Sequence, residues 1–438
     1  MQVTVEKKEG IHCELAIEVP FIEIDKEVTK RLQKIAKTAK FDGFRPGKVP
    51  VNFVKKRYGE EIRFEVIGDV LPQKYVKAIQ DESLNAAGVE IDIKHNKEGE
   101  DLKFTVHVEL YPEIEVSGLD QIEVEKPLVA IGDVEVEKMI DNLRKQVATW
   151  KTVEREAKDG DTVVIDFVGT KDGEEFGGGS AKDQNLVLGS GQMIPGFEAG
   201  VIGMKKADIK TIDVTFPEDY QSVDLAGKEV QFEITLNEVK EAELPEINEE
   251  FAKKFGVDGD VEAFYTEIRG NMDRELRAAI KKAVKEQIFD GLKKTNEVEV
   301  PKTLIQNEIK RAKEDLMKRM GGNDSQVKLE DIPDDLFKDA SEARIKLGLI
   351  VNAIVEKNKL EASNEKVTAM IEEMASVYED AEEVKAHYRD NEKDLENIKG
   401  AVVEDELVEF VLSQAKVTEK ETDFFELIRT TMANSQMQ

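Results

Sequence analysis

The first 112 residues contain three stretches in which apolar and polar side chains alternate, the period of a half-buried strand. The apolar positions are Ile11, Cys13, Leu15, Ile17 and Val19 in the first stretch, Val89, Ile91 and Ile93 in the second, and Phe104, Val106, Val108 and Leu110 in the third. A shorter strand through Val3 and Val5 precedes them, with a turn at Glu9-Gly10. The pattern predicts an antiparallel sheet.

Two helices are expected between the first and second stretches. Over residues 25–40, Val28, Leu32, Ile35, Ala36 and Ala39 recur at helical spacing. A second helix is expected to begin at Pro50 and end at Gly59, because proline suits the first turn of a helix and glycine its end. Helix then resumes, with an interruption expected at Pro72, which lacks a backbone N–H. Residues 1–112 are therefore expected to form an α+β domain.

Residues 113–150 are expected to connect this domain to the next. Pro112 and Pro127 bracket an extended piece, and a connector helix follows with Asp133 as its N-cap. Its apolar positions are Val136, Ile140, Leu143, Val147 and Trp150. Residues 151–243 are rich in glycine, and strands are expected at 162–168, 185–188, 210–216 and 230–239.

From residue 244 the pattern is mainly helical. Helices are expected over 251–256 and 260–294, from Pro301 to Gly321-Gly322, and near 335–358, 363–378, 381–390 and 401–415. Apolar residues recur along these helices, among them Leu304, Ile305, Ile309, Met317, Met320, Ile350, Ile354, Met370 and Met374. They form the core of a helix bundle or an open apolar face, and methionine-rich faces adapt to varied partners. The tail from residue 418 is expected to be partly ordered.

Composition limits the kinds of chemistry available. A chain of 438 residues exceeds one ordinary core, so about three domains are expected. The single cysteine, Cys13, excludes a disulfide scaffold within one chain and fits a reducing compartment. The four histidines lack metal-ligand spacing, so we expect no metal and no other cofactor. The sequence offers neither a signal peptide at its N-terminus nor an apolar run of membrane-spanning length, which predicts a soluble, cytoplasmic protein with no membrane partner.

Charge is distributed unevenly along the chain. The net charge is −30, yet residues 26–57 contain eleven Lys and Arg against two acids. Within this segment lies a stiff turn formed by Gly43, Phe44, Arg45, Pro46, Gly47 and Lys48, followed by Val49-Pro50. An aromatic residue between cations indicates a surface that contacts an anionic partner. The alternative is a tight turn with a solvated basic face.

A glycine-rich block spans residues 189–200, with the sequence Gly-Ser-Gly-Gln-Met-Ile-Pro-Gly-Phe-Glu-Ala-Gly. It is not a phosphate-binding loop, because it lacks the Gly-Lys-Ser/Thr ending and carries apolar residues. The Gly-x-x-Ile-Pro-Gly-aromatic-Glu-x-Gly pattern resembles the FKBP fold, a peptidyl-prolyl isomerase. The resemblance implies a pocket lined by Phe167, Phe176, Ile194, Phe197, Tyr220 and Phe232. The alternative is that these aromatic residues are core of a small sheet.

The implied chemistry needs no acid, base or metal. Rotation about an Xaa-Pro bond is slow because the planar amide is resonance-stabilised. A dry apolar pocket favours the twisted amide, and the Ile194 N–H and the Tyr220 hydroxyl would orient the substrate carbonyls. Phe176 is followed by Gly177 where FKBPs often carry Asp, so macrolide inhibition is not implied.

The Gly43–Pro50 block also matches the Gly-Phe-Arg-x-Gly-x-x-Pro signature of the trigger factor family, which the whole chain resembles. The resemblance implies a multidomain α+β protein with four segments: a ribosome-binding domain (1–112), a linker (113–150), an FKBP-like sheet-and-helix domain (151–243) and a mainly α chaperone domain with helical arms (244–438). The implied partners are a protein at the rim of the large-subunit exit tunnel, nearby ribosomal RNA, and nascent or unfolded polypeptides. The family's client-binding faces would include the apolar residues named above, and a homodimer off the ribosome is left open.

Three functions are compatible with these features. The first is a ribosome-associated chaperone that binds nascent chains and isomerises Xaa-Pro bonds. The second is a free-standing multidomain prolyl isomerase, for which the basic turn has no use. The third is a nucleic-acid-binding protein, which the net charge of −29 beyond residue 112 disfavours.

Overall fold

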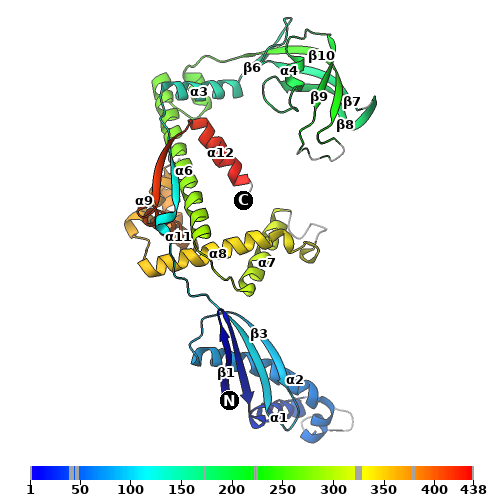
Figure 1. The fold of residues 1–438 in the computed structure, drawn as a ribbon, viewed down its shortest axis with the longest axis vertical. Coiled ribbons are helices and arrows are strands. Elements are labelled where there is room, and N and C mark those ends of the chain that lie inside the picture. The colour runs from blue at the N-terminus through cyan, green and yellow to red at the C-terminus, as the bar shows by residue number, and fades with distance from the viewer. Residues whose placement is uncertain are drawn as a thin grey trace. The chain divides into compact units, whose positions relative to one another are not determined.

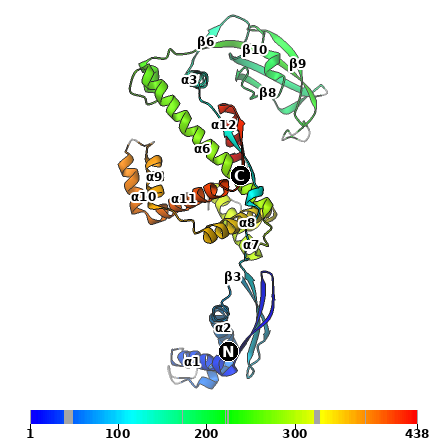
Figure 2. The ribbon, with the colours of Figure 1, turned by 60° about the vertical axis from the view of Figure 1, so that its left-hand side comes forward.

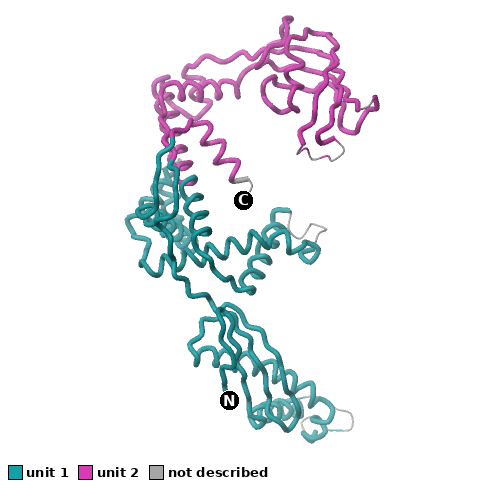
Figure 3. The backbone as a smooth tube through the Cα atoms, in the orientation of Figure 1, with its two compact units in different colours: residues 1–126, 283–420 teal, residues 127–282, 421–438 magenta. Residues whose placement is uncertain are grey.

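The computed structural model describes residues 2–436 except 39–43, 45–48, 172, 219, 221, 223–224, 321–327, 377 and 379. The chain divides into two compact units, each built from two stretches of sequence (Figure 3). Unit 1 comprises residues 1–126 and 283–420, and unit 2 comprises residues 127–282 and 421–438. One boundary between them falls inside a single long helix, α6 (Val261–Thr295).

Unit 1 begins with a four-stranded antiparallel sheet covered on one face by two helices (Figures 1 and 2). The strand order is β1-β2-β4-β3, so the first and third predicted stretches pair at its centre. The elements are β1 (Gln2–Glu9), β2 (His12–Val19), α1 (Phe21–Thr38), α2 (Val51–Asp81), β3 (Ala86–His95) and β4 (Leu102–Leu110). The predicted strands and the antiparallel α+β fold are confirmed here.

The core of this sheet domain follows from the alternation. The residues buried on β2 and β4 include Leu15, Ile17, Phe104 and Val106, and they pack with apolar residues of both helices. Burial of apolar surface stabilises a fold by roughly 25 cal/mol per Å². The apolar face shared by the sheet and the two helices is therefore the main contact that holds α1 and α2 on the sheet.

Helix α2 departs from the expectation, since it continues through both Gly59 and Pro72. The predicted end at Gly59 and the predicted interruption at Pro72 were therefore wrong. An interior glycine costs about 1 kcal/mol and an interior proline about 3 kcal/mol of helix stability. Val54, Ile62, Val66, Ile67, Leu71 and Ala78 are all buried along the helix. Burial of that face against the sheet outweighs the two local costs.

The rest of unit 1 is mainly helical. Its elements are η1 (Leu119–Gln121), β5 (Glu123–Leu128), the C-terminal part of α6, α7 (Lys302–Arg319), η3 (Leu329–Asp331), α8 (Asp335–Asn358), α9 (Asn364–Ala375), α10 (Ala381–Asp390), α11 (Glu392–Leu412) and β11 (Lys416–Glu421). Helix α11 begins before the expected residue 401, and its N-cap Asn391 accepts the Asp394 N–H. Strand β11 pairs with β5, which the local pattern did not predict.

Unit 2 contains a five-stranded sheet, with the order β6-β10-β7-β8 and β9 beside β10. Its elements are α3 (Asp133–Gln146), β6 (Thr149–Val153), β7 (Thr162–Lys171), β8 (Glu174–Val187), α4 (Phe197–Val201), β9 (Ile209–Thr215), β10 (Glu229–Glu243), α5 (Glu249–Lys254), the N-terminal part of α6, and α12 (Phe424–Gln436). All the sheet pairings are antiparallel. The predicted FKBP-like sheet and helix are thus present.

The connector helix is shorter than expected. It ends at Gln146, and Trp150 lies in β6 opposite Ala242 of β10. Pairing with β10 provides hydrogen-bond partners for the backbone N–H and C=O groups of this segment. The helical spacing of its apolar residues gives no sign of this pairing. The N-cap is Gly132, whose N–H is bonded by the Glu135 carboxylate at 2.9 Å, and not the predicted Asp133.

Candidate functional site

A cluster of aromatic rings lies at one end of the sheet in unit 2. Phe167 comes from β7, Phe176 from β8, Phe232 from β10, and Phe197 opens α4. The Phe197 centroid lies 5.2 Å from that of Phe232 and 5.6 Å from that of Phe167, and both pairs meet edge to face. Edge-to-face packing at this separation is the preferred arrangement of aromatic rings.

These rings differ in their exposure. Phe197 and Phe232 are buried, at 1% and 4% exposed, whereas Phe167 and Phe176 are half-buried. The two inner rings therefore form a floor, and the outer two lie at its edge. Both interpretations made from the sequence are thus partly satisfied: Phe197 and Phe232 belong to the core, and the same cluster presents aromatic surface outward.

Two glycines make room for the Phe176 ring. A Cβ atom added at Gly169 would lie 2.8 Å from the Phe176 ring and 2.6 Å from that of Phe232. A Cβ atom added at Gly179 would lie 2.6 Å from the other side of the Phe176 ring. The ring position therefore depends on a glycine of the neighbouring strand β7 and on a second glycine of its own strand β8.

The remaining predicted pocket residues lie around this cluster. Ile194 is half-buried and packs against the domain core, and Tyr220 is 41% exposed. Sequence reasoning missed Phe216, whose centroid lies 4.5 Å from that of Tyr220 and 6.1 Å from that of Phe176. A signal was present, because Phe216 continues the alternation of Ile212 and Val214. Phe216 is buried and supports the exposed Tyr220 ring.

The loop that leads into Ile194 is bonded to one carboxylate. Glu198 accepts the N–H groups of Gly189, Gly191 and Met193 at 2.8, 3.2 and 3.3 Å. It also accepts the Ser190 hydroxyl at 3.2 Å. Burial raises the pKa of Glu198, but these donors outweigh it, so the pKa lies below its ordinary value. The sequence motif contains Glu198 but does not reveal this role.

An ion pair between half-buried Arg155 and the buried Asp161 carboxylate lies at the start of the same domain. The Arg155 guanidinium donates to both carboxylate oxygens of Asp161, at 2.6 and 2.8 Å, and pairs with Glu241 of β10 at 3.0 Å. Asp161 also accepts the Lys158 N–H at 2.8 Å. Burial raises the pKa of Asp161, but the hydrogen bonds from Arg155 and the Lys158 N–H outweigh that effect, so the pKa lies below its usual value.

Only Phe44 of the six predicted ribosome-binding residues lies among the described residues. Gly43, Arg45, Pro46, Gly47 and Lys48 lie outside them. Phe44 is half-buried, packs against the core of the sheet domain, and has its centroid 5.0 Å from that of Phe53 on α2. It is therefore anchored to the domain, which the sequence did not reveal.

Some of the cations counted in residues 26–57 have partners within the domain. Arg31 pairs with Glu65 at 2.6 Å and with Asp69, and Lys55 pairs with Glu98 at 2.8 Å. These acids lie beyond residue 57 in the sequence, so counting charge over residues 26–57 omits them. The local excess of positive charge is smaller than that count indicates.

The predicted client-binding residues fall into two groups. Ile309, Ile350 and Ile354 are buried, so they offer no accessible surface in this structure. The others keep some exposure: Met320 and Met374 are exposed, and Leu304, Ile305, Met317 and Met370 are half-buried. Helices α7 and α8, which carry most of these residues, pack against each other (Figure 1).

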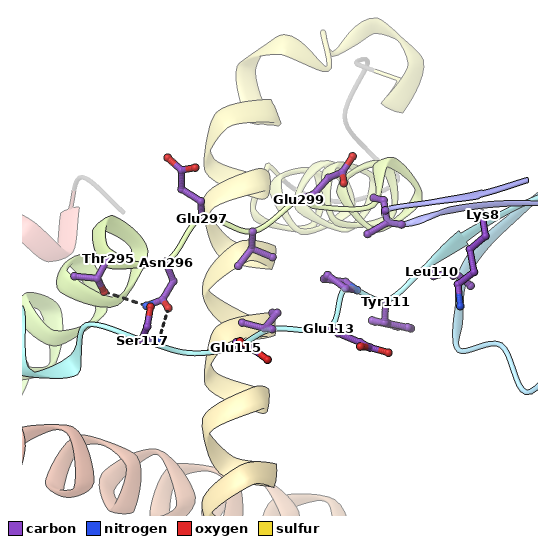
Figure 4. A pocket seen from close by; sticks show the side chains of 15 residues that line it. Lys8, Leu110, Tyr111, Glu113, Glu115, Ser117, Thr295, Asn296, Glu297 and Glu299 are labelled. Atoms are coloured by element: carbon purple, nitrogen blue, oxygen red, sulfur yellow. Dashed lines mark hydrogen bonds between the residues drawn. The ribbon is translucent and has the colours of Figure 1, made fainter.

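An acidic groove of about 550 Å³ lies in unit 1, between the end of the sheet domain and the segment joining α6 to α7 (Figure 4). Glu113, Glu115, Glu297 and Glu299 line it, with Lys8 at one end. Asn296 closes one side, where it accepts the Ser117 N–H at 3.0 Å and donates to Leu292 and Thr295. Its carboxylates make it unsuited to phosphate.

The described residues also bear on two other kinds of site. No group of three or more His, Cys, Asp or Glu side chains in that part of the chain is arranged to hold a metal ion. Nor does any helix there combine the length and apolarity needed to cross a bilayer.

Three protein-family models match successive parts of the chain. Residues 153–237 match the model described as FKBP-type peptidyl-prolyl cis-trans isomerase. The chain therefore contains a peptidyl-prolyl isomerase domain of the FKBP type, and the aromatic cluster lies within the matched residues. Residues 1–143 match "bacterial trigger factor protein", and residues 260–413 match its C-terminus.

Full-length relatives agree with these matches. The trigger factor of Francisella philomiragia is 53% identical over 100% of this chain and 99% of its own, and that of Marinobacter nauticus is 46% identical over 98% and 99%. The chain belongs to the trigger factor family. It is a ribosome-associated chaperone with prolyl isomerase activity. A solved trigger factor structure aligns over 94% of this chain and 99% of its own at 19% identity, with a TM-score of 0.48.

Proposed function

We propose that the aromatic cluster of unit 2 is the catalytic pocket, with Phe167, Phe176, Ile194, Phe197, Tyr220 and Phe232 lining it and Phe216 supporting Tyr220. The observation that carries this is the packing of the Phe197 ring against both Phe232 and Phe167, directly after the Ile-Pro-Gly segment. A proline ring fits against such a surface. The twisted amide has lost resonance and is less polar at oxygen, so a dry aromatic environment stabilises it relative to the planar amide.

The test is exchange spectroscopy on an Xaa-Pro peptide with the full-length protein. Phe197→Ala should lower cis–trans exchange by at least about tenfold, equivalent to about 1.4 kcal/mol of transition-state stabilisation. Phe251→Ala is the matched control, since Phe251 is equally buried but packs with Phe255 and Phe264 outside the sheet. Equal losses in the two variants would show an effect of stability and overturn the assignment.

We further propose that the turn at residues 43–48 binds both a protein at the exit-tunnel rim and the adjacent ribosomal RNA. Support comes from the motif itself and from its position between α1 and α2. Arg45 and Lys48 supply charge for phosphate or carboxylate, while the anchored Phe44 ring fixes one point of the turn. The protein would thus act in the cytoplasm, where ribosomes are.

Co-sedimentation with ribosomes tests this proposal. Arg45→Ala/Lys48→Ala should abolish co-sedimentation, whereas Lys94→Ala/Lys103→Ala, the same charge change on the sheet, should leave it intact. Phe44→Ala is kept as a separate variant because its ring packs in the domain. A photocrosslinker at position 48 should capture RNA and a large-subunit protein, and capture of neither would overturn the assignment.

For clients, we propose that the accessible apolar residues of α7 and α9 with Met320 form the capture surface: Leu304, Ile305, Met317, Met320, Met370 and Met374. Their partial exposure supports this, and hydrophobic capture scales with accessible apolar area. Met320→Ser with Met374→Ser should reduce aggregation suppression with little change in stability. Ile350→Ser, at a buried position, should instead unfold the protein, and if the exposed pair unfolds it too, those residues are core.

Off the ribosome, we propose a homodimer. Ile22 and Phe64 in the sheet domain are 79% and 69% exposed, so a second copy that covered them would bury apolar surface. Sedimentation velocity should show a dimer that Phe64→Ser weakens. A monomer at all micromolar concentrations would contradict the proposal.

A further inference from the structure

Glu198 is the one acid of the Ile-Pro-Gly-Phe-Glu segment, and its carboxylate is hydrogen-bonded to the preceding loop. Its neighbour Phe197 places a buried ring in the pocket floor. The first turn of α4 thus carries a pocket ring at one position and a loop-binding carboxylate at the next. The two features are mechanically joined through adjacent backbone atoms.

The loop bonded to Glu198 has a conformation that turns its amides inward. Gly189 and Gly191 have φ values of +87° and +69°, which residues with a Cβ rarely adopt. In this conformation three amides converge on one carboxylate. The Oε2 atom accepts the Gly189 and Gly191 N–H groups, and the Oε1 atom accepts the Met193 N–H and the Ser190 hydroxyl.

We infer that Glu198 is a positioning residue for the isomerase reaction: it fixes the loop so that the Ile194 N–H meets the substrate carbonyl. This rests on the pocket proposed above. Only the two backbone dihedrals of Met193 separate its bonded N–H from the peptide plane that holds the Ile194 N–H. On the other side, the Ile194 carbonyl accepts the Phe197 N–H at 3.1 Å. The donor is therefore held from both sides.

Replacing Glu198 with glutamine should remove one specific hydrogen bond of the loop. A glutamine keeps the length of the side chain but offers one acceptor oxygen in place of two. If that oxygen serves Gly189 and Gly191, the amide nitrogen faces the Met193 N–H, donor against donor. The Ser190 hydroxyl can rotate and accept a hydrogen bond from the glutamine amide instead of donating one. The bond that is lost is therefore the one from the Met193 N–H, which is nearest to Ile194. A hydrogen-bond donor that is already in position, such as the Ile194 N–H, stabilises the transition state more than the bound substrate. Its misplacement should therefore lower kcat more than it raises KM.

The experiment measures kcat and KM separately for an Xaa-Pro peptide, using the full-length protein. Glu198→Gln should lower kcat about tenfold with KM changed less than about twofold. The matched control is Asp208→Asn, which removes a carboxylate that accepts the Lys205 N–H at 2.8 Å in another turn of the same domain. That control should keep kcat within twofold, since its turn does not lead into the pocket.

The inference would be overturned if the Glu198→Gln variant is folded and its kcat stays within twofold of the wild-type value. It would also be overturned if Asp208→Asn lowers kcat by the same factor as Glu198→Gln. If instead the proposed pocket is wrong, Phe197→Ala would leave cis–trans exchange unchanged. That result is distinguishable from a failure of the Glu198 inference alone. Should Glu198→Gln not fold, amide hydrogen exchange on the wild-type chain decides. The Gly191 and Met193 amides should be protected before any peptide is added, and exchange at the rate of free amides would refute the role of Glu198.

Discussion

The Arg155–Asp161 pair shows how much one residue can contribute when its partner is buried. Asp161 is 4% exposed and receives both guanidinium nitrogens. Removing Arg155 would leave a buried carboxylate with the Lys158 N–H as its remaining described donor. Breaking a buried ion pair by removing one partner costs more than the pair contributes, because an uncompensated charge remains.

Arg155→Ala should therefore destabilise the sheet of unit 2 by about 3 kcal/mol. Lys205→Ala, which removes an exposed pair with Glu156, should cost less than about 1 kcal/mol. Chemical unfolding followed by Trp150 fluorescence measures both, since Trp150 lies on β6 of this sheet. Equal effects would mean that the Asp161 site relaxes to admit water.

The same two carboxylates predict an acid limit for this sheet. Asp161 and Glu198 have folded pKa values below their ordinary ones, so both stabilise the fold fully above the unfolded values of about 3.9 and 4.3. That stability is lost as the pH falls through the lower folded values. Unfolding free energy should thus be flat from pH 7 to 5 and decline below about pH 4. In Glu198→Gln the decline should be shallower, and an unchanged decline would contradict the low pKa.

Glycine at position 169 is expected to be required for the pocket. Gly169→Ala places a methyl group within 3 Å of the Phe176 and Phe232 rings, so both must shift. Overpacking of this kind costs about 1–3 kcal/mol, and the displaced Phe176 ring should lower isomerase activity. Gly177→Ala is the control, because nothing lies within 4 Å of its added Cβ atom. Comparable activity in the two variants would show that Phe176 is not needed.

At the scale of elements, helix α7 is capped by a residue from another part of the chain. Glu109 at the end of β4 accepts the Thr303 N–H at 2.8 Å and the Thr303 hydroxyl at 2.7 Å. Pro301, the N-cap residue, has no side chain able to do this. Gly88 on β3 makes the approach possible, since an added Cβ atom would lie 2.1 Å from the Thr303 hydroxyl. The cap therefore joins the sheet domain to α7 within unit 1.

Glu109→Ala should cost about 1 kcal/mol, the usual loss for an N-cap, and should increase amide exchange in the first turn of α7. Glu90→Ala, an exposed carboxylate on β3, is the control and should leave that exchange unchanged. Because burial raises and the Thr303 donors lower the pKa of Glu109, with a net lowering, the wild-type protection should weaken below about pH 4.3. Protection that is insensitive to the variant would mean that α7 is held by other contacts.

At the scale of the whole molecule, the isomerase sheet is inserted with its two ends together. Strand β6 pairs with the end of β10, so Thr149 lies opposite Glu243. Beyond both strands, the Arg144 guanidinium on α3 donates to the Pro245 carbonyl at 2.9 Å. The chain on either side of the insertion is therefore already joined without it.

Deleting residues 149–243 and closing the gap with a short Gly/Ser linker should leave a folded protein that has lost isomerase activity. Suppression of aggregation of a refolding client should persist, because hydrophobic capture depends on apolar area and needs no catalytic pocket. Light scattering measures suppression, and circular dichroism confirms the helices. Loss of suppression in a folded deletion variant would place client capture on the isomerase sheet.

Elements whose burial follows a simple period were predictable from the sequence. Strands β2 and β4 alternate because one face is buried, and that alternation is visible in any five consecutive residues. The glycine-rich block indicated a tight turn before Phe197 for a similar reason: its backbone turns require glycine and proline at fixed positions. Local requirements leave local signals.

Features that depend on residues far apart in the chain became visible only in the folded structure. Helix α2 passes through Gly59 and Pro72 because burial against the sheet exceeds local costs of about 1 and 3 kcal/mol. Trp150 is in a strand because β10 is its neighbour, and Glu109 caps a helix that begins almost 200 residues later. Glu198 sits in a motif visible in the sequence, but its three backbone donors converge only when the loop closes over it. Such contacts have no period, since their energy comes from partners that folding alone brings together.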